Sequence, residues 1–212
     1  MTIGIVGSGA VGTTLARGLS ERGHQLTLGT RRPDDHRALE PAVRIGAFAD
    51  AARDGDVVIL AVRWSAVEDV FAAIGAETLR GKVLIDASNP LRYENGRPVG
   101  LETLAEGSAA QRVAALATGA RVVKAFNVVG AGLMVAPQIA GGPPDMFLCG
   151  DDADAKRVVS QLCDDLGYPA LDVGPLVRAA ELEHLAMLWI SLAMTGAFAK
   201  HAFKLLREPN RG

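Results

Sequence analysis

A glycine-rich turn near the start of the chain constrains its fold more than any other feature. It joins an apolar run at residues 2–6, which predicts a strand, to a helix predicted at residues 10–22, and it reads Gly7-Ser8-Gly9-Ala10-Val11-Gly12. In this GxGxxG pattern the first glycine permits a tight turn, the second lets backbone approach a pyrophosphate, and the third lets the helix pack on the strand. The free N–H groups of the helix N-terminus attract phosphate. The turn therefore predicts a dinucleotide site, with a ligand-free strand–helix turn as the alternative.

Strand and helix patterns alternate along the rest of the chain. Further strands are expected at residues 25–28, 42–45, 57–62, 83–85, 121–125, 146–149 and 170–173. Helices are expected at residues 47–53, 66–74, 109–116, 153–166 and about 176–206, and a polar loop at residues 92–100. This alternation predicts an α/β fold, a Rossmann-type doubly wound parallel sheet with a small C-terminal extension ending in a long helix.

Composition excludes several classes of function. The 212 residues carry a net charge of −2 and no basic run, so a nucleic-acid partner is not expected. The longest uncharged run, residues 185–199, is shorter than the ~18 residues of a membrane span. Two cysteines provide neither a disulfide scaffold nor a cysteine zinc site, and no basic leader precedes the first strand. We therefore expect a cytoplasmic protein without a membrane segment.

The end of the second predicted strand bears on the choice of dinucleotide. An NAD site has Asp or Glu here to accept from the ribose 2′-hydroxyl. This chain has Thr30, Arg31 and Arg32, which offer charge-assisted donors to a 2′-phosphate. The segment favours NADP. The alternative is that the arginines are ordinary loop charges paired with Asp34 and Asp35.

Groups suited to acid–base or nucleophilic catalysis are scarce. The histidines, at positions 24, 36, 184 and 201, lie outside the predicted strand-end loops, and the HxxxH, CxxC and GxSxG spacings are absent. Hydride transfer between two cofactors needs only that donor and acceptor be stacked and water excluded. We therefore expect hydride chemistry, no catalytic side chain and no metal.

Several segments recur in an order that resembles the F420-dependent NADP oxidoreductases, also called NADPH-dependent coenzyme F420 reductases. They are IGIVGSGAVG at residues 3–12, GTRRP at 29–33, AVRW at 61–64, DASNP at 86–90, VVKAFN at 122–127, CGDD at 149–152 and LDVGPL at 171–176. The resemblance covers essentially the whole chain. The KAFN-type segment is also shared with the reductase domain of membrane ferric reductases.

The resemblance implies an organisation and a set of ligands. Residues 1–127 would form the NADP-binding Rossmann domain, and residues 128–212 would form the acceptor pocket and the dimer helix. The implied cofactors are NADP and a second one, coenzyme F420 or a flavin. Independently, the helix is apolar on most of its circumference between residues 182 and 192, which also predicts a homodimer.

The family pattern also implies roles for individual residues. Ser8, Gly9, Ala10 and Val11 would line the pyrophosphate turn, and Thr30, Arg31 and Arg32 would hold the 2′-phosphate. The ribose and nicotinamide would be bordered by two groups that follow the fourth and fifth strands, Val62, Arg63 and Trp64, then Ala87, Ser88 and Asn89. Archaeal members have a proline where this chain has Arg63, and a histidine near the deazaflavin where it has Asn127.

Five side chains beyond the glycine turn are weighed individually. The amide of Asn127 is expected to orient a nicotinamide carboxamide or a substrate carbonyl. Lys124 is interpreted either as a solvated strand-end charge or as a functional group, and Trp64 either as a hydrophobic lid or as a ligand contact. Cys149 and Cys163 are interpreted as small buried hydrophobes.

An acceptor pocket is expected between the strand-end loops, residues 127–134 and the C-terminal helix. Gly130 and Gly132 would allow backbone near a planar ring, and an apolar wall would come from Val128, Val129, Leu133 and Met134. The function expected is hydride transfer between NADP(H) and a deazaflavin or flavin-like acceptor. The alternatives are NADPH-dependent reduction of a small C=N or C=O substrate, or NADPH binding without catalysis.

Overall fold

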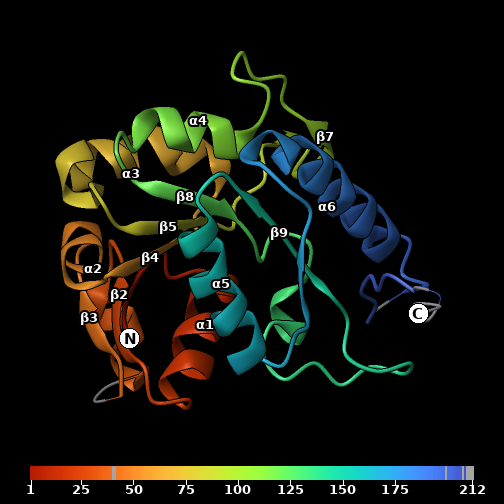
Figure 1. The fold of residues 1–212 in the computed structure, drawn as a ribbon, viewed down its shortest axis with the longest axis horizontal. Helices are drawn as coiled ribbons and strands as arrows, with labels where there is room; N and C mark the ends of the chain where they lie inside the picture. Colours follow the sequence, from red (N-terminus) through yellow and green to blue (C-terminus); the bar gives the residue numbers. More distant parts are fainter. Residues whose placement is uncertain (40–41, 199, 207, 209–212) are drawn as a thin grey trace.

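One eight-stranded sheet runs through the computed structural model, which describes residues 1–39, 42–198, 200–206 and 208 (Figure 1). Its strand order is β10-β9-β8-β5-β4-β1-β2-β3. The strands are β1 (Thr2–Val6), β2 (Gln25–Gly29), β3 (Arg44–Gly46), β4 (Val57–Leu60), β5 (Val83–Asp86), β8 (Arg121–Lys124), β9 (Met146–Gly150) and β10 (Ala170–Asp172). The six neighbouring strands β8, β5, β4, β1, β2 and β3 are parallel, which confirms the predicted Rossmann-type fold.

The last two strands extend the sheet beyond β8. Strand β9 runs antiparallel to β8, and β10 runs parallel to β9. The sheet is thus mostly parallel, with its direction reversed at one edge.

Helices cover both faces of the sheet (Figure 1). They are α1 (Ala10–Ser20), α2 (Phe48–Asp54), α3 (Val67–Ile74), α4 (Ala109–Leu116), α5 (Ala153–Asp165) and α6 (Ala179–Met194). One core layer joins α1 and α5 to the sheet face that bears Ile5 and Ile59. The other joins α2, α3, α4 and α6 to the face that bears Val58 and Leu84. Because alternate side chains of a strand point to opposite faces, strands such as VVIL in β4 are apolar throughout.

Both cysteines are packed inside these layers, as expected. Cys149 and Cys163 are free thiols with no exposed surface. Burial raises the pKa of Cys149 to about 12 and also raises that of Cys163, so both remain protonated at neutral pH.

The doubly wound order places a switch point between β1 and β4. From β1 the chain moves outward to β2 and β3, then crosses back to β4 on the other side of β1. Ligands of such sheets bind beyond the carboxyl ends of the strands at this point. The glycine turn follows β1 and the Val62–Trp64 segment follows β4, so both lie at that crevice.

The segment expected as a polar loop at residues 92–100 is instead a β-hairpin. Its strands are β6 (Leu91–Glu94) and β7 (Arg97–Leu101), paired antiparallel. Asn95 and Gly96 have φ values of 49° and 76°, the left-handed pair that a two-residue hairpin turn requires. The Asn-Gly dipeptide was a signal for this hairpin in the sequence.

The final helix is shorter than expected. It ends at Met194, and Gly196 takes a φ of 73°, a left-handed conformation that ends helices. The chain then folds back on α6, where Trp189 Nε1 donates to the carbonyl of His201 at 2.9 Å. The expectation of a helix to residue 206 was therefore wrong. No helix in the described ranges has both the length and the apolar character that crossing a bilayer requires.

Candidate functional site

The three glycines of the first turn differ in how closely other atoms approach them. A Cβ on Gly12 would lie 1.9 Å from the carbonyl oxygen of Gly7, and one on Gly7 would lie 2.3 Å from that of Ala61. These two glycines are therefore required by the close packing of α1, β1 and β4. A Cβ on Gly9 would meet no atom within 4 Å. Gly9 is the N-cap residue of α1, and no side chain caps the helix there. The open space at Gly9 fits a phosphate group held by the helix N-terminus.

The loop after β2 meets the glycine turn at the same edge of the sheet. Ser8 Oγ lies 2.8 Å from Thr30 Oγ1, and the backbone N–H of Arg32 donates to Thr30 Oγ1 at 3.1 Å. Thr30 is buried, so its hydroxyl fixes the loop, while Arg31 and Arg32 are exposed. Thr30 thus fixes the backbone of the loop that carries the two arginines predicted to hold the 2′-phosphate.

Arg32 has an acidic neighbour, as the alternative interpretation required. Arg32 Nη1 lies 3.6 Å from Asp35 Oδ2, and both side chains are more than half exposed. An exposed pair of this kind contributes ~0–1 kcal/mol. It leaves Arg32 available to a phosphate, which bears more charge than a single carboxylate.

Two asparagines form a paired contact at the carboxyl ends of β5 and β8. Asn89 Nδ2 donates to the backbone oxygen of Asn127, and Asn127 Nδ2 donates to Asn89 Oδ1, each at 3.0 Å. Asn127 Nδ2 also donates to the Leu182 carbonyl of α6 at 3.1 Å. Sequence reasoning predicted both asparagines but not their contact with each other or with α6.

The side-chain oxygen of Asn127 is left without a partner. Asn127 is 6% exposed, and within the described chain its Oδ1 is the buried side-chain polar atom that has no hydrogen bond. An unsatisfied buried acceptor costs ~1–3 kcal/mol. An N–H donor such as a nicotinamide carboxamide would satisfy it, so the residues present fit a bound nicotinamide.

The residue before Asn127 has a strained backbone. Phe126 has a φ of 63° and is 1% exposed. Positive φ is a genuine outlier for a bulky residue, and such strain persists only where the surrounding structure enforces it. The turn at Phe126 sets the direction in which Asn127 leaves β8.

Lys124 is fully buried, so its interpretation as a solvated strand-end charge was wrong. Its Nζ donates to Asp86 Oδ2 at 2.8 Å and to the Ser88 carbonyl at 2.6 Å, and it lies 3.0 Å from Glu183 Oε1. Burial by itself lowers the pKa of Lys124, but the Asp86 and Glu183 carboxylates outweigh it and raise the pKa above its ordinary value. The ammonium therefore stays charged, held by β5, the following loop and α6.

The carboxylates around Lys124 are held in turn. Glu183 accepts from the free N–H groups of Ala109 and Ala110 at the N-terminus of α4, at 3.1 and 3.3 Å. Asp86 Oδ1 accepts from the backbone and the hydroxyl of Ser88, at 2.9 and 2.6 Å. Sequence reasoning missed Asp86 and Glu183. The signal was a charged residue at the end of an apolar strand and another inside an apolar helix, since buried charges need partners.

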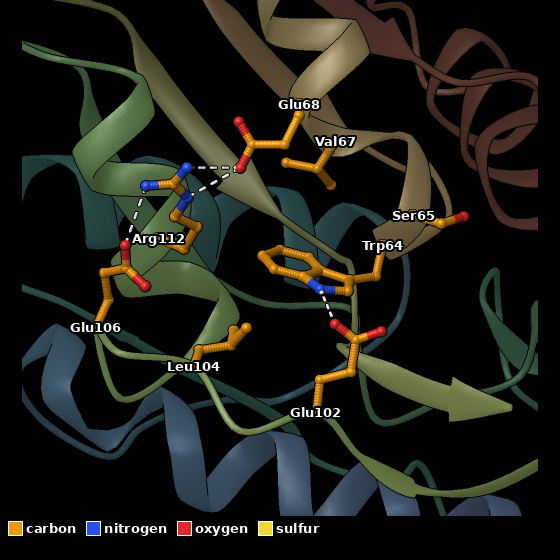
Figure 2. A pocket seen from close by; sticks show the side chains of 8 residues that line it. All are labelled: Trp64, Ser65, Val67, Glu68, Glu102, Leu104, Glu106 and Arg112. Atoms are coloured by element: carbon orange, nitrogen blue, oxygen red, sulfur yellow. Dashed lines mark hydrogen bonds and ion pairs between the residues drawn. The ribbon is translucent and has the colours of Figure 1, made fainter.

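The segment after β4 borders a cavity of about 460 Å³ (Figure 2). Arg63 is exposed, and Trp64 Nε1 donates to Glu102 at 3.0 Å. Arg112 faces Trp64 across the cavity and binds both Glu68 and Glu106, at 2.7 and 3.0 Å. The lining therefore has three carboxylates and one guanidinium. This balance favours an uncharged or cationic ligand group over an anionic one.

The expected apolar wall of an acceptor pocket is part of the core instead. Met134 is fully buried in the layer under α1 and α5, and Leu133 is 7% exposed. A Cβ on Gly130 would lie 2.6 Å from the indole of Trp189. The planar ring that lies against the backbone of Gly130 is therefore the indole of Trp189 on α6, so an acceptor ring has no room there. Gly132 does face open space.

The histidines whose side chains the structure describes stay outside the strand-end crevice. His24 Nε2 lies 3.0 Å from Asp165, His184 is exposed on α6, and His201 stacks on Trp189; the side chain of His36 lies outside the described residues. In the part of the chain that the structure describes, no cluster of His, Cys, Asp or Glu is arranged to hold a metal ion.

The fold and the crevice together define a class of protein. A Rossmann-type sheet, an open helix N-terminus at Gly9, two exposed arginines after β2 and an unsatisfied amide beyond β8 are the features of a dinucleotide-binding oxidoreductase.

Comparison with known proteins specifies the family. The family model "NADP oxidoreductase coenzyme F420-dependent" matches residues 2–90. A crystal structure of a candidate F420-dependent NADP reductase from Arthrobacter sp. FB24 superimposes with a TM-score of 0.90 at 35% identity, covering 98% of this chain and all of that one. The F420-dependent NADP reductase of Methanocaldococcus jannaschii is 31% identical over 68% of this chain and 64% of that protein.

A longer protein is also related. Rat metalloreductase STEAP3 is 31% identical over 87% of this chain, which spans 36% of the length of that protein. The chain belongs to the F420-dependent NADP oxidoreductase family and is an NADP-dependent oxidoreductase.

Two glycine substitutions distinguish a glycine that leaves room for a ligand from one that is required for packing. Gly9→Ala adds a methyl group in open space, so we expect the thermal unfolding midpoint to stay within about 1 °C and NADPH affinity to fall about tenfold or more. Gly12→Ala forces α1 away from β1, so we expect the midpoint to fall by several degrees. Calorimetry of the apo-protein and NADPH titration measure both effects. Unchanged affinity in Gly9→Ala would contradict the site.

Proposed function

We propose that this chain transfers hydride between NADP(H) and a deazaflavin or flavin-like acceptor. The observation that carries the proposal is the strand-end crevice itself. It has anion-binding features at the glycine turn and the arginine loop and an unsatisfied amide oxygen at Asn127, and the histidine side chains that the structure describes lie outside it. The Methanocaldococcus relative, described as an F420-dependent NADP reductase, supports the same acceptor class.

In this proposal each group of residues has a physical task. The turn at residues 7–12 holds the pyrophosphate, and Thr30, Arg31 and Arg32 hold the 2′-phosphate. The segments at residues 62–64 and 87–89 border the ribose and nicotinamide, and Asn127 accepts from the carboxamide. When bound, NADPH supplies the hydride. The chain binds it, orients its ring and excludes water, which is what hydride transfer between two rings requires. Residues 1–127 form the NADP side, and residues 128–212 the acceptor side.

A second acceptor class is favoured by the cavity beside Trp64. Its lining has three carboxylates, one guanidinium and an indole. A cationic group is stabilised by carboxylates and by the face of an indole. A protonated C=N substrate fits this lining better than the anionic tail of a deazaflavin does.

Spectroscopy distinguishes these candidates. Purified protein is mixed with NADPH and, separately, coenzyme F420, a free flavin and a panel of cyclic imines, and the loss of NADPH absorbance is followed. We expect turnover with F420 or a flavin. Turnover with imines alone would favour C=N reduction, and NADPH binding without oxidation by any acceptor would indicate a binding protein.

Cofactor preference follows from the arginine loop. Arg31 and Arg32 each supply a charge-assisted contact of ~1.5–3 kcal/mol, so we expect NADPH to bind at least about 100-fold tighter than NADH. Arg31→Ser with Arg32→Ser should remove most of this difference by weakening NADPH binding. Arg17→Ser, on the exposed last turn of α1, is the matched control and should change neither affinity. Equal affinities in the unmutated protein, measured by titration, would end the NADP assignment.

We also propose that the chain forms a homodimer through α6 and the segment after it. On α6 and in the turn that follows it, Leu188, Met194 and Phe198 are 50%, 49% and 49% exposed. Large apolar side chains that stay exposed on one helix and the turn after it favour burial against a second protein surface. Light scattering at micromolar concentration should give twice the chain mass. Leu188→Glu should give a monomer, while Ala73→Glu on the exposed face of α3 should not. A monomeric unmutated protein would refute the dimer.

A further inference from the structure

The buried ion cluster of Lys124, Asp86 and Glu183 lies directly behind the two asparagines of the crevice. Asp86 is the last residue of β5, and its partner Ser88 immediately precedes Asn89. Glu183 immediately follows Leu182, whose carbonyl accepts from Asn127. Lys124 ends β8, and only Ala125 and the strained Phe126 separate it from Asn127. Each side of the asparagine pair is thus joined to the cluster by one or a few residues.

The ammonium of Lys124 has a full set of partners. Its three N–H groups face oxygens of Asp86, Ser88 and Glu183, all between 2.6 and 3.0 Å from Nζ. These oxygens come from the end of β5, the loop after it and α6. Because Lys124 has no exposed surface and no bond left to form, it does not touch a cofactor or a substrate itself.

We infer that Lys124 is a positioning residue that, through Asp86, Ser88 and Glu183, holds the Asn89–Asn127 pair in place so that Asn127 Oδ1 accepts from the nicotinamide carboxamide. This inference rests on the proposed binding of NADP(H) in the crevice. The strained φ of Phe126 agrees with it, since a strained turn persists only where its two ends are fixed. Lys124 fixes the end before Phe126, and the bonds of Asn127 fix the end after it.

The position of the cluster predicts a selective effect on binding. The phosphate-binding residues follow β1 and β2, whereas the cluster touches β5, β8, α4 and α6. Loosening the cluster should therefore weaken contacts to the nicotinamide and leave contacts to the phosphates intact. A purely structural ion pair would instead change overall stability without separating the two parts of the ligand.

Two ligands and three variants test this prediction by calorimetric titration. The ligands are NADP⁺ and 2′-phospho-ADP-ribose, which lacks the nicotinamide. The first variant combines Lys124→Met, Asp86→Asn and Glu183→Gln, so that no unpaired charge is left buried. The second, Glu183→Gln alone, is the milder change and keeps the Lys124–Asp86 pair. The control is Lys82→Met, since Lys82 also donates to three oxygens, the carbonyls of residues 52, 53 and 55, but lies at the opposite end of β5.

We expect the triple variant to lose about tenfold in NADP⁺ affinity while its affinity for 2′-phospho-ADP-ribose stays within about twofold. Glu183→Gln should show the same pattern with a smaller loss. The control should lower the thermal unfolding midpoint without changing the ratio of the two affinities. An unchanged ratio in the triple variant and Glu183→Gln, or an equal loss for both ligands, would overturn the inference.

The unmutated protein separates failure of this inference from failure of the proposed function. Binding of neither ligand would contradict the proposed function. Equal binding of both ligands would leave NADP binding intact but would overturn the placement of the nicotinamide beside Asn127, and with it the role of Lys124.

Discussion

The close contact between α1 and β1 is the constraint on which the rest of the structure depends. A Cβ on Gly12 would overlap the carbonyl oxygen of Gly7, and a Cβ on Gly7 would overlap that of Ala61, just after β4. This contact sets the direction of α1, and α1 with α5 forms one of the two core layers. It also brings the N-terminus of α1 to the switch point between β1 and β4, where its free N–H groups face the crevice. Packing and binding therefore depend on the same short turn.

Charge inside the molecule is concentrated at the other end of the crevice. Removing one partner of a buried ion pair costs ~3–5 kcal/mol, because the remaining charge is left buried and unpaired. The loss of Lys124, Asp86 or Glu183 alone would therefore destabilise the fold. Two carboxylates surround one ammonium, and the N-terminus of α4 offsets the excess negative charge by donating two N–H groups to Glu183. The cluster joins β5, β8, α4 and α6 at the point where the asparagine pair begins.

The C-terminal helix contributes more to the crevice than its position in the chain suggests. Leu182 and Glu183 contact Asn127 and Lys124, and Trp189 fills the space in front of Gly130. The apolar residues that follow β8 consequently pack in the core or against α6. What remains open around the crevice is Gly9, the exposed arginines, Gly132 and the cavity at Trp64. These features define where a dinucleotide and an acceptor have room.

The sequence by itself determined the fold class, the glycine turn and the arginine loop. Each depends on local patterns, namely apolar periodicity, glycine spacing and the residues that follow a strand, and local patterns are readable without knowing what packs where. The hairpin at residues 91–101 was equally readable from Asn95-Gly96, and the end of α6 from Gly196, since both depend on left-handed backbone. Only the tertiary structure decided the partners of Lys124, the pairing of Asn89 with Asn127 and the filling of Gly130 by Trp189. Those contacts join residues that are far apart in the sequence and lie on separate strands and helices. The partner of a buried charge, or the side chain that fills the space beside a glycine, is therefore known only when the fold places the two next to each other.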